Sequence, residues 1–179
     1  MSSEIVQWFP LRVTYNRELR IKECFNRVGI ECFVPMRYEL EEKDGVPYTK
    51  LLPAIHNLIF VHSTQEVITD LKMRDKAFSP VRYLINRTKE KHVIMTVPDQ
   101  EMENFIRVAS VEDNSIFYLG NSNYINRIGR KVRITAGKFK GVEGIIKRIK
   151  RNRHVVVQIE GIAAVAITFI PSEFIELIN

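Results

Sequence analysis

The first 109 residues alternate between two patterns of apolar spacing. Short runs rich in β-branched and aromatic residues are typical of strands. Such runs occupy Gln7–Val13, Glu31–Leu40, Tyr48–His62, Val81–Ile85 and His92–Val97. Three other segments, which start near Asn16, Ser63 and Pro98, place apolar residues at helical spacing. The predicted order is β, α, β, β, α, β, β, α, which indicates an α+β fold with an antiparallel sheet and three helices.

Local signals define where several of these elements begin or turn. Asn16 has the side chain of an N-cap for the first helix, and Ser63 with Glu66 three residues later forms a capping box for the second. Asp44-Gly45 is the strongest hairpin signal in the chain, because both residues tolerate positive φ. We therefore expect the second and third strands to form a hairpin with its charged tip in solvent.

The pattern changes after residue 109. Ser110–Asn126 loses periodicity and is rich in Asn and Ser, which is typical of a linker. Short β-branched strands separated by Gly and Asn turns then predict a small barrel, with strands at Val132–Thr135, Val142–Ile149, His154–Ile159 and Val165–Ile170. The predicted domains are residues 1–109 and 127–179, joined by a linker at 110–126.

The positive charge of the chain lies in one segment. The formal net charge is +6, yet residues 127–154 carry eleven Lys or Arg against Glu143 alone. Residues 1–126 are nearly neutral, with 16 basic and 17 acidic residues. A local cationic field of this kind attracts nucleic acid or another anionic partner.

The sequence carries no constellation for catalysis or for metal binding. Cys24 and Cys32 form no CxxC pair, and the four histidines show no HExxH spacing. No phosphate-binding glycine loop follows a strand, and the acidic residues of the predicted hairpin indicate a solvated face. We expect a protein that is not an enzyme and has no cofactor. Without a signal peptide or a long apolar run, we also expect it to be cytoplasmic.

Gly129–Ile149 contains the most informative motif, GRKVRITAGKFKGVEGIIKRI. Gly137, Gly141 and Gly144 lie between strand-forming residues, where the chain reverses or backbones approach closely. This segment resembles a KOW motif, with a strand, a Gly-x-Phe-x-Gly turn and a return strand. The alternative is that any small barrel needs glycines in its turns.

The N-terminal half resembles the NusG N-terminal domain. The resemblance rests on Trp8-Phe9, on Phe33-Val34-Pro35, and on Leu52-Pro53 followed by Asn57-Leu58-Ile59-Phe60-Val61. With the KOW-like segment it covers nearly the whole chain in one consistent order. His56-Asn57-Leu58 and Phe33-Val34-Pro35-Met36 are closer to the specialised RfaH branch, and the chain is most similar to UpxY-type antiterminators of capsular polysaccharide operons.

This resemblance implies three binding surfaces on a monomer. An apolar depression would dock the clamp helices of the largest RNA polymerase subunit, through Phe33, Ile55, Leu58 and Phe60; the alternative is that some of these residues are core. A basic face would contact the non-template DNA strand, through Arg17, Arg20, Lys22, Arg27, Arg74 and Lys76. The KOW turn would bind a small-subunit ribosomal protein or nascent RNA, through Lys138, Phe139 and Lys140, with Phe139 displayed outward between Gly137 and Gly141.

Three functions follow as hypotheses. The first is a specialised antitermination factor that promotes read-through of one long operon, selected by a DNA element. The second is a general NusG-type elongation factor that binds polymerase everywhere. The third is a KOW-type ribosome-binding or RNA-binding protein without polymerase contact, against which the Trp8-Phe9 strand and the hairpin return argue.

Overall fold

The computed structural model describes residues 5–87, 92–119 and 129–179. It divides the chain into two compact units, Met1–Asp99 and Gln100–Asn179. The third helix therefore groups with the C-terminal unit, whereas the sequence placed it at the end of the first domain. Residues 120–126 of the predicted linker lie outside the described residues, and the predicted linker bounds stay a prediction.

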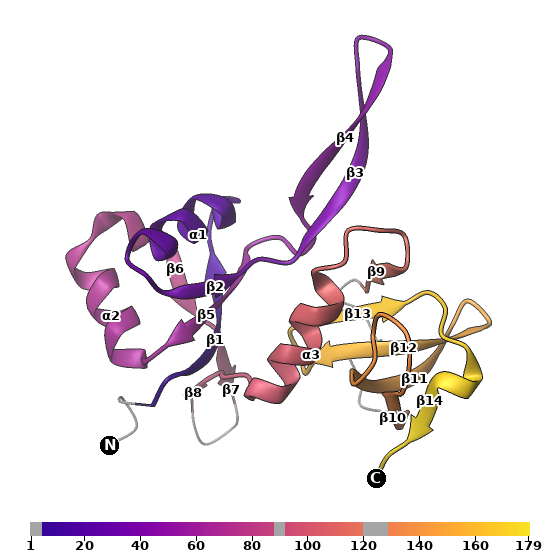
Figure 1. The fold of residues 1–179 in the computed structure, drawn as a ribbon. Helices are drawn as coiled ribbons and strands as arrows, with labels where there is room; N and C mark the ends of the chain where they lie inside the picture. Colours follow the sequence, from indigo (N-terminus) through magenta and orange to yellow (C-terminus); the bar gives the residue numbers. More distant parts are fainter. Residues whose placement is uncertain (1–4, 88–91, 120–128) are drawn as a thin grey trace. The chain divides into compact units, whose positions relative to one another are not determined.

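The first unit contains a four-stranded antiparallel sheet with the order β2-β5-β1-β6 (Figure 1). Its strands are β1 (Gln7–Val13), β2 (Glu31–Phe33), β5 (Leu58–Ser63) and β6 (Val81–Tyr83). Strands β1 and β5 are central, and Pro10 of β1 is tolerated there although proline removes a donor from the ladder. A proline in a strand is typical of an edge or an irregular position, but this strand is a regular central one.

Helices α1 (Glu18–Arg27) and α2 (Gln65–Arg74) and the short 3-10 helix η1 (Lys76–Phe78) complete the core of this unit. Ile21 and Phe25 of α1 and Ile68 of α2 are buried with the sheet residues Phe9 and Val61 in one cluster. Both predicted helices are thus confirmed, but Val28 and Val67, which the helical spacing also placed on their apolar faces, are exposed.

The predicted helix caps need correction. Arg17 occupies the N-cap of α1 without a side-chain cap hydrogen bond, because Asn16 adopts a left-handed φ of 51° in the preceding turn. Thr64 caps α2, and its side chain accepts a hydrogen bond from the backbone N–H of Val67. The Ser63–Glu66 capping box was therefore one residue out of register.

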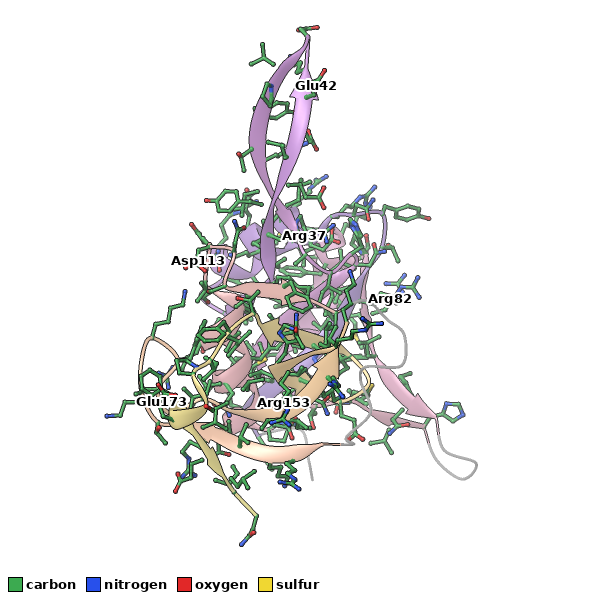
Figure 2. The ribbon with its side chains drawn as sticks, turned by 90° about the vertical axis from the view of Figure 1, so that its right-hand side faces the viewer. Arg37, Glu42, Arg82, Asp113, Arg153 and Glu173 are labelled. Atoms are coloured by element: carbon green, nitrogen blue, oxygen red, sulfur yellow. The ribbon has the colours of Figure 1, made fainter. Side chains whose placement is uncertain are left out.

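The predicted second and third strands are each divided in two. After β2, Val34 and Pro35 interrupt the run, and β3 (Met36–Lys43) then pairs with β4 (Val46–Pro53) as a separate two-stranded sheet. A turn containing Asn57, at a φ of 61°, separates β4 from β5. The hairpin at Asp44-Gly45 is confirmed, with both residues at positive φ. Figure 2 labels Glu42 near the tip of this projecting hairpin and Arg37 near its base.

Two further short strands, β7 (Ile85–Arg87) and β8 (His92–Ile94), pair with each other instead of extending the main sheet. A bridge between Trp8 and Val97 ties the end of this segment back to β1. The single strand expected at Val81–Ile85 is thus two, because the chain leaves the main sheet after Tyr83.

The second unit holds a six-stranded antiparallel sheet with the order β14-β10-β11-β12-β13-β9. Its elements are α3 (Asp99–Ala109), β9 (Ile116–Tyr118), β10 (Arg130–Ile134), β11 (Glu143–Ile149), β12 (Asn152–Ile159), β13 (Ala163–Ile167), η2 (Ser172–Phe174) and β14 (Ile175–Leu177). The predicted barrel strands are present. Among the described residues, however, the end strands β14 and β9 form no ladder with each other, and β9 comes from the predicted linker.

Helix α3 packs on this sheet through its apolar side. Met102, Phe105 and Val108 are fully buried. The side chain of Asn104 is buried as well, and its Oδ1 accepts a hydrogen bond of 3.2 Å from the backbone N–H of Glu143. A buried amide needs such a partner, so this bond fixes the helix to the start of β11.

Gly144 is predicted to tolerate no side chain, although its φ is unremarkable. A Cβ at this position would lie 2.7 Å from the backbone oxygen of Val156 and 2.9 Å from Cγ1 of Val155. We expect Gly144→Ala to lower the unfolding free energy of the C-terminal unit by about 1–3 kcal/mol, because the neighbouring strand must move. Denaturant titration measures this, with Lys131→Ala on the adjacent strand as the control. Equal stability of the two variants would contradict the close approach.

Candidate functional site

The four-stranded sheet of the first unit is apolar on both faces, and the helices α1 and α2 pack against one of them. Ile59 and Val61 of β5 point into the cluster with α1 and α2. Since side chains alternate along a strand, Leu58 and Phe60 lie on the opposite face. Phe33 pairs with Phe60 in the ladder, and Pro10 is its neighbour on the other side. We call this surface the apolar face; it consists of Trp8, Pro10, Phe33, Leu58 and Phe60.

The four predicted polymerase-binding residues are not equivalent. Phe33, Leu58 and Phe60 share the apolar face, whereas Ile55 lies in the turn that precedes β5. Phe33 and Ile55 are half-buried, but Leu58 is only 4% exposed and Phe60 is fully buried. Phe33 and Ile55 are thus the two members of the set whose side chains are the more accessible to a partner.

Charged and aromatic groups border the apolar face. The indole of Trp8 stacks on the imidazole of His62 at 4.8 Å, and His62 Nδ1 lies 3.1 Å from a carboxylate oxygen of Glu31. Arg12 of β1 and Arg82 of β6 are directly paired in the ladder, and both are exposed. They lie on the same face of the sheet as Leu58, which pairs with Arg12 on the other side. Sequence reasoning missed these two arginines, although Arg12 alternates in step with Trp8 and Pro10.

The predicted DNA-binding residues of α1 do not all share one side of the helix. At about 100° per residue, Arg17, Arg20 and Arg27 fall within roughly 80° of one another. All three are exposed. Lys22 lies about 160° from Arg20 around the helix axis and is half-buried. The structure therefore groups three of these side chains and separates Lys22 from them.

Arg74 and Lys76 are exposed residues at the end of α2 and in η1. The Phe25–Phe78 ring contact, with centroids 4.8 Å apart, brings η1 against the last turns of α1. Arg74 donates to a carboxylate oxygen of Asp70 at 2.6 Å, so its charge is already partly neutralised within α2. Lys76 is the better candidate of the two for an anionic ligand.

An exposed tyrosine extends this basic group and was also missed. Tyr15, at a φ of 65°, is 81% exposed, and the guanidinium of Arg17 lies 5.4 Å from its ring centroid. Hydrogen bonds that involve Asn57 hold in place the turn that carries Tyr15. The backbone N–H of Asn57 donates to the buried carboxylate of Glu18, and Asn57 Oδ1 accepts from the N–H of Asn16 at 3.3 Å. We call Tyr15, Arg17, Arg20 and Arg27 the basic flank.

Phe139 does not point outward as predicted. It is only 4% exposed, although Gly137 and Gly141 do adopt the positive φ values that the turn requires. The turn closes through hydrogen bonds from Lys140 N–H to Gly137 O and from Val142 N–H to Phe139 O, which direct the ring inward. The apolar ring gains burial in this way, and the lysines on either side remain exposed.

Lys138 and Lys140 differ in the contacts that their side chains form within the protein. Lys138 Nζ donates to Asp113 and to Ser115, both at 2.6 Å, and lies 5.1 Å from the Phe139 ring centroid. The hydrogen bonds that the Asp113 carboxylate accepts, first from Lys138 and then from Ser115, lower the pKa of Asp113 to about 2. In the described part of the chain, the side chain of Lys140 forms no hydrogen bond or ion pair of this kind. Its backbone oxygen accepts a hydrogen bond from Arg107 at 2.7 Å.

Metal-site and membrane-span geometry are both absent from the described residues. No cluster of three or more His, Cys, Asp or Glu there could hold a metal ion. None of the described helices is long and apolar enough to cross a membrane. Cys24 and Cys32 are free thiols, and burial raises the pKa of Cys32 to about 11, so this thiol stays protonated at neutral pH.

Comparison with known proteins places the chain in a family. Residues 6–106 match the family model described as transcription termination factor nusG, and residues 128–160 match the KOW motif. A solved structure described as domain interaction in Thermotoga maritima NusG is 18% identical, with 98% of each chain covered and a TM-score of 0.42. No curated protein matches. Because the first model spans more than half of the sequence, the chain belongs to the NusG family of transcription factors and carries that family's N-terminal domain followed by a KOW motif.

Proposed function

We propose that this protein is an antitermination factor that binds elongating RNA polymerase through the apolar face and promotes read-through of a specific long operon. The observation that carries the proposal is the second apolar side of the main sheet. The helices cover one side with Phe9, Ile59 and Val61, and the other side carries Phe33, Leu58 and Phe60. It acts by binding and catalyses no reaction, and it needs no cofactor.

An apolar face bordered by charge suits the tip of a helical hairpin such as the polymerase clamp helices. Burial of apolar area contributes about 25 cal/mol per Å2, from which the cost of association is subtracted. Phe33 and Ile55 supply the first apolar contacts. Arg12 and Arg82 at the border would orient an acidic partner, because like charges on neighbouring strands repel until a counter-charge arrives.

Selection of one operon would come from the basic flank. Tyr15 offers an exposed ring on which an unpaired base can stack, and Arg17, Arg20 and Arg27 offer cations to the phosphates around it. This combination fits the single-stranded non-template DNA of a transcription bubble. The resemblance of His56-Asn57-Leu58 and Phe33-Val34-Pro35-Met36 to specialised members supports an operon for capsular or other surface polysaccharide.

A general NusG-type elongation factor is the second candidate function, and family membership by itself supports this one. The two differ in where the protein is found on the genome. A specialised factor is recruited at a promoter-proximal DNA element, so its occupancy begins there and stays on one operon. A general factor follows polymerase on all transcribed genes.

Ile55→Asp should reduce the affinity for RNA polymerase at least tenfold, or about 1.4 kcal/mol, because it places a charge in an apolar contact. Ile55 lies in a turn, so the variant should stay folded by circular dichroism. Met73→Asp on α2, at a side chain that is 79% exposed, is the matched control and should bind normally. Unchanged binding of Ile55→Asp, or equal loss in both variants, would remove the turn that carries Ile55 from the proposed polymerase contact.

Arg20→Gln should reduce recruitment to the target operon more than Lys22→Gln does. The two substitutions remove the same charge from the same helix, but only Arg20 belongs to the basic flank. Occupancy on the operon and affinity for free polymerase are measured for both variants and for Tyr15→Ala. We expect Arg20→Gln and Tyr15→Ala to lose occupancy while free polymerase binds normally. If Lys22→Gln lost as much, general charge rather than the flank would be responsible.

In the KOW turn, we expect Phe139 to determine stability and its neighbour Lys140 to determine partner binding. Phe139→Ala should lower the unfolding free energy by about 3–5 kcal/mol, because it empties a buried ring site. Lys140→Glu should keep the melting temperature and weaken binding to small ribosomal subunits about threefold or more. Lys131→Glu is the charge-matched control. Normal ribosome binding by Lys140→Glu would exclude this turn as the partner site.

A further inference from the structure

A second cationic surface lies in the C-terminal unit and shares no residue with the Gly137–Gly141 turn. It is a hollow of about 1010 Å3 at the start of β10, the end of β11 and the start of β12. The segment from Phe169 to Ile175 and Leu177 of β14 close its other side. Its floor is apolar, with Ile146, Val155 and Ile175 among the lining residues.

The positive charges that line this hollow repel one another when no ligand is bound. Arg148 and Arg153 stand directly opposite each other on β11 and β12. Like charges at opposed positions of an antiparallel pair destabilise the sheet. Arg130 pairs with Ile146 one step along the same face, so it lies on the same side of the sheet. The hollow therefore gathers three guanidinium groups from three adjacent strands.

Elsewhere in the same sheet, the chain pairs opposed charges instead. Arg133 stands opposite Glu143 and donates to its carboxylate at 2.6 Å. Within the described residues, Arg130, Arg148 and Arg153 have no ion-pair partner; the Nε of Arg148 donates only to the backbone oxygen of Arg151, at 3.3 Å. A carboxylate is present at the border, on Glu173, but it forms no such pair with them. The cationic character of the hollow is thus left for a ligand.

An exposed aromatic ring also lines the hollow beside these cations. Phe169 follows β13, lines the hollow and is 76% exposed. A ring with this exposure adds little to the core and offers a platform on which a base can stack. Guanidinium groups bind phosphate oxygens in a bidentate manner, so the cations and the ring together match a nucleotide chain.

We propose that this hollow is a binding site for single-stranded RNA, with phosphates at Arg130, Arg148 and Arg153 and a base stacked on Phe169. Ser172 and Glu173, also in the lining, supply a hydroxyl and a carboxylate acceptor at the border. A carboxylate repels phosphate but accepts a hydrogen bond from a ribose 2′-hydroxyl, which DNA lacks. The site uses no residue of the apolar face, so it stands or fails independently of polymerase binding. Arg153 and Glu173 are labelled in Figure 2.

The test uses the full chain and a fluorescent oligouridine of about twelve nucleotides, titrated by anisotropy at about 50 and about 200 mM salt. Arg148→Gln with Arg153→Gln should reduce the affinity about tenfold at the lower salt. The slope of log K against log salt should become less negative by about 1.4, since two phosphate contacts are lost. Lys43→Gln with Lys50→Gln removes the same charge from the β3–β4 hairpin and should change the affinity less than twofold.

Phe169 provides a test that does not depend on charge. Phe169→Leu should weaken RNA binding at least about fivefold, whereas Phe169→Trp should retain it, because only the latter keeps a stacking surface. The side chain is exposed, so neither substitution disturbs the core. Melting temperatures should be equal for both variants.

Four outcomes would overturn the proposal. One is a control pair that loses as much affinity as the arginine pair. Another is a Phe169→Leu variant that binds like the parent protein. Equal affinity for the matching oligodeoxynucleotide would reject RNA as the ligand. Finally, a concentration-dependent dimer in sedimentation velocity, abolished by the arginine substitutions in a protein that binds no RNA, would assign the hollow to a second copy of the chain.

Discussion

Strand β5 is buried on both faces, and the candidate site depends on the register that this imposes. Its pairing with β1 aligns Leu11 with Ile59 and Phe9 with Val61, all within the core formed with the helices. The same alternation places Leu58 and Phe60 on the apolar face. A slip by one residue would exchange the two sets, so core packing and the partner surface are fixed by one register. Neither face can be redesigned without regard to the other.

The apolar face and the basic flank are joined by one buried polar contact. Glu18 begins α1, and its carboxylate accepts the backbone N–H of Asn57, the residue immediately before β5. Leaving a buried carboxylate without this donor would cost free energy comparable with that of a lost charged hydrogen bond, about 1.5–3 kcal/mol. The contact fixes the turn that holds Tyr15 and Arg17 to the start of the strand that carries Leu58. The spacing between the two proposed contacts is therefore part of the fold.

The sequence was informative where a signal is local. Helical spacing predicted all three helices, and Asp44-Gly45 predicted the hairpin because these residues accept the positive φ that a two-residue turn needs. The break between β4 and β5 was missed, since Asn57 gives no apolar signal and its left-handed φ is supported by Glu18, 39 residues away. The inward direction of Phe139 was missed for a similar reason. Glycines predict that a turn occurs, but hydrogen bonds within the turn and available core volume decide where its central side chain goes.

Charge counts predicted a cationic C-terminal unit but could not predict which cations remain available. Two of its basic residues are neutralised by partners that the fold brings near, Arg133 by Glu143 across adjacent strands and Lys138 by Asp113, 25 positions earlier in the chain. Arg148 and Arg153 have the same charge and similar exposure, yet the register sets them against each other. Electrostatic attraction to a ligand is greatest where the protein leaves repulsion unrelieved, because the ligand then removes an existing cost as it adds its own contacts. The availability of a basic residue for an anionic partner is thus a property of strand pairing, and composition alone does not determine it.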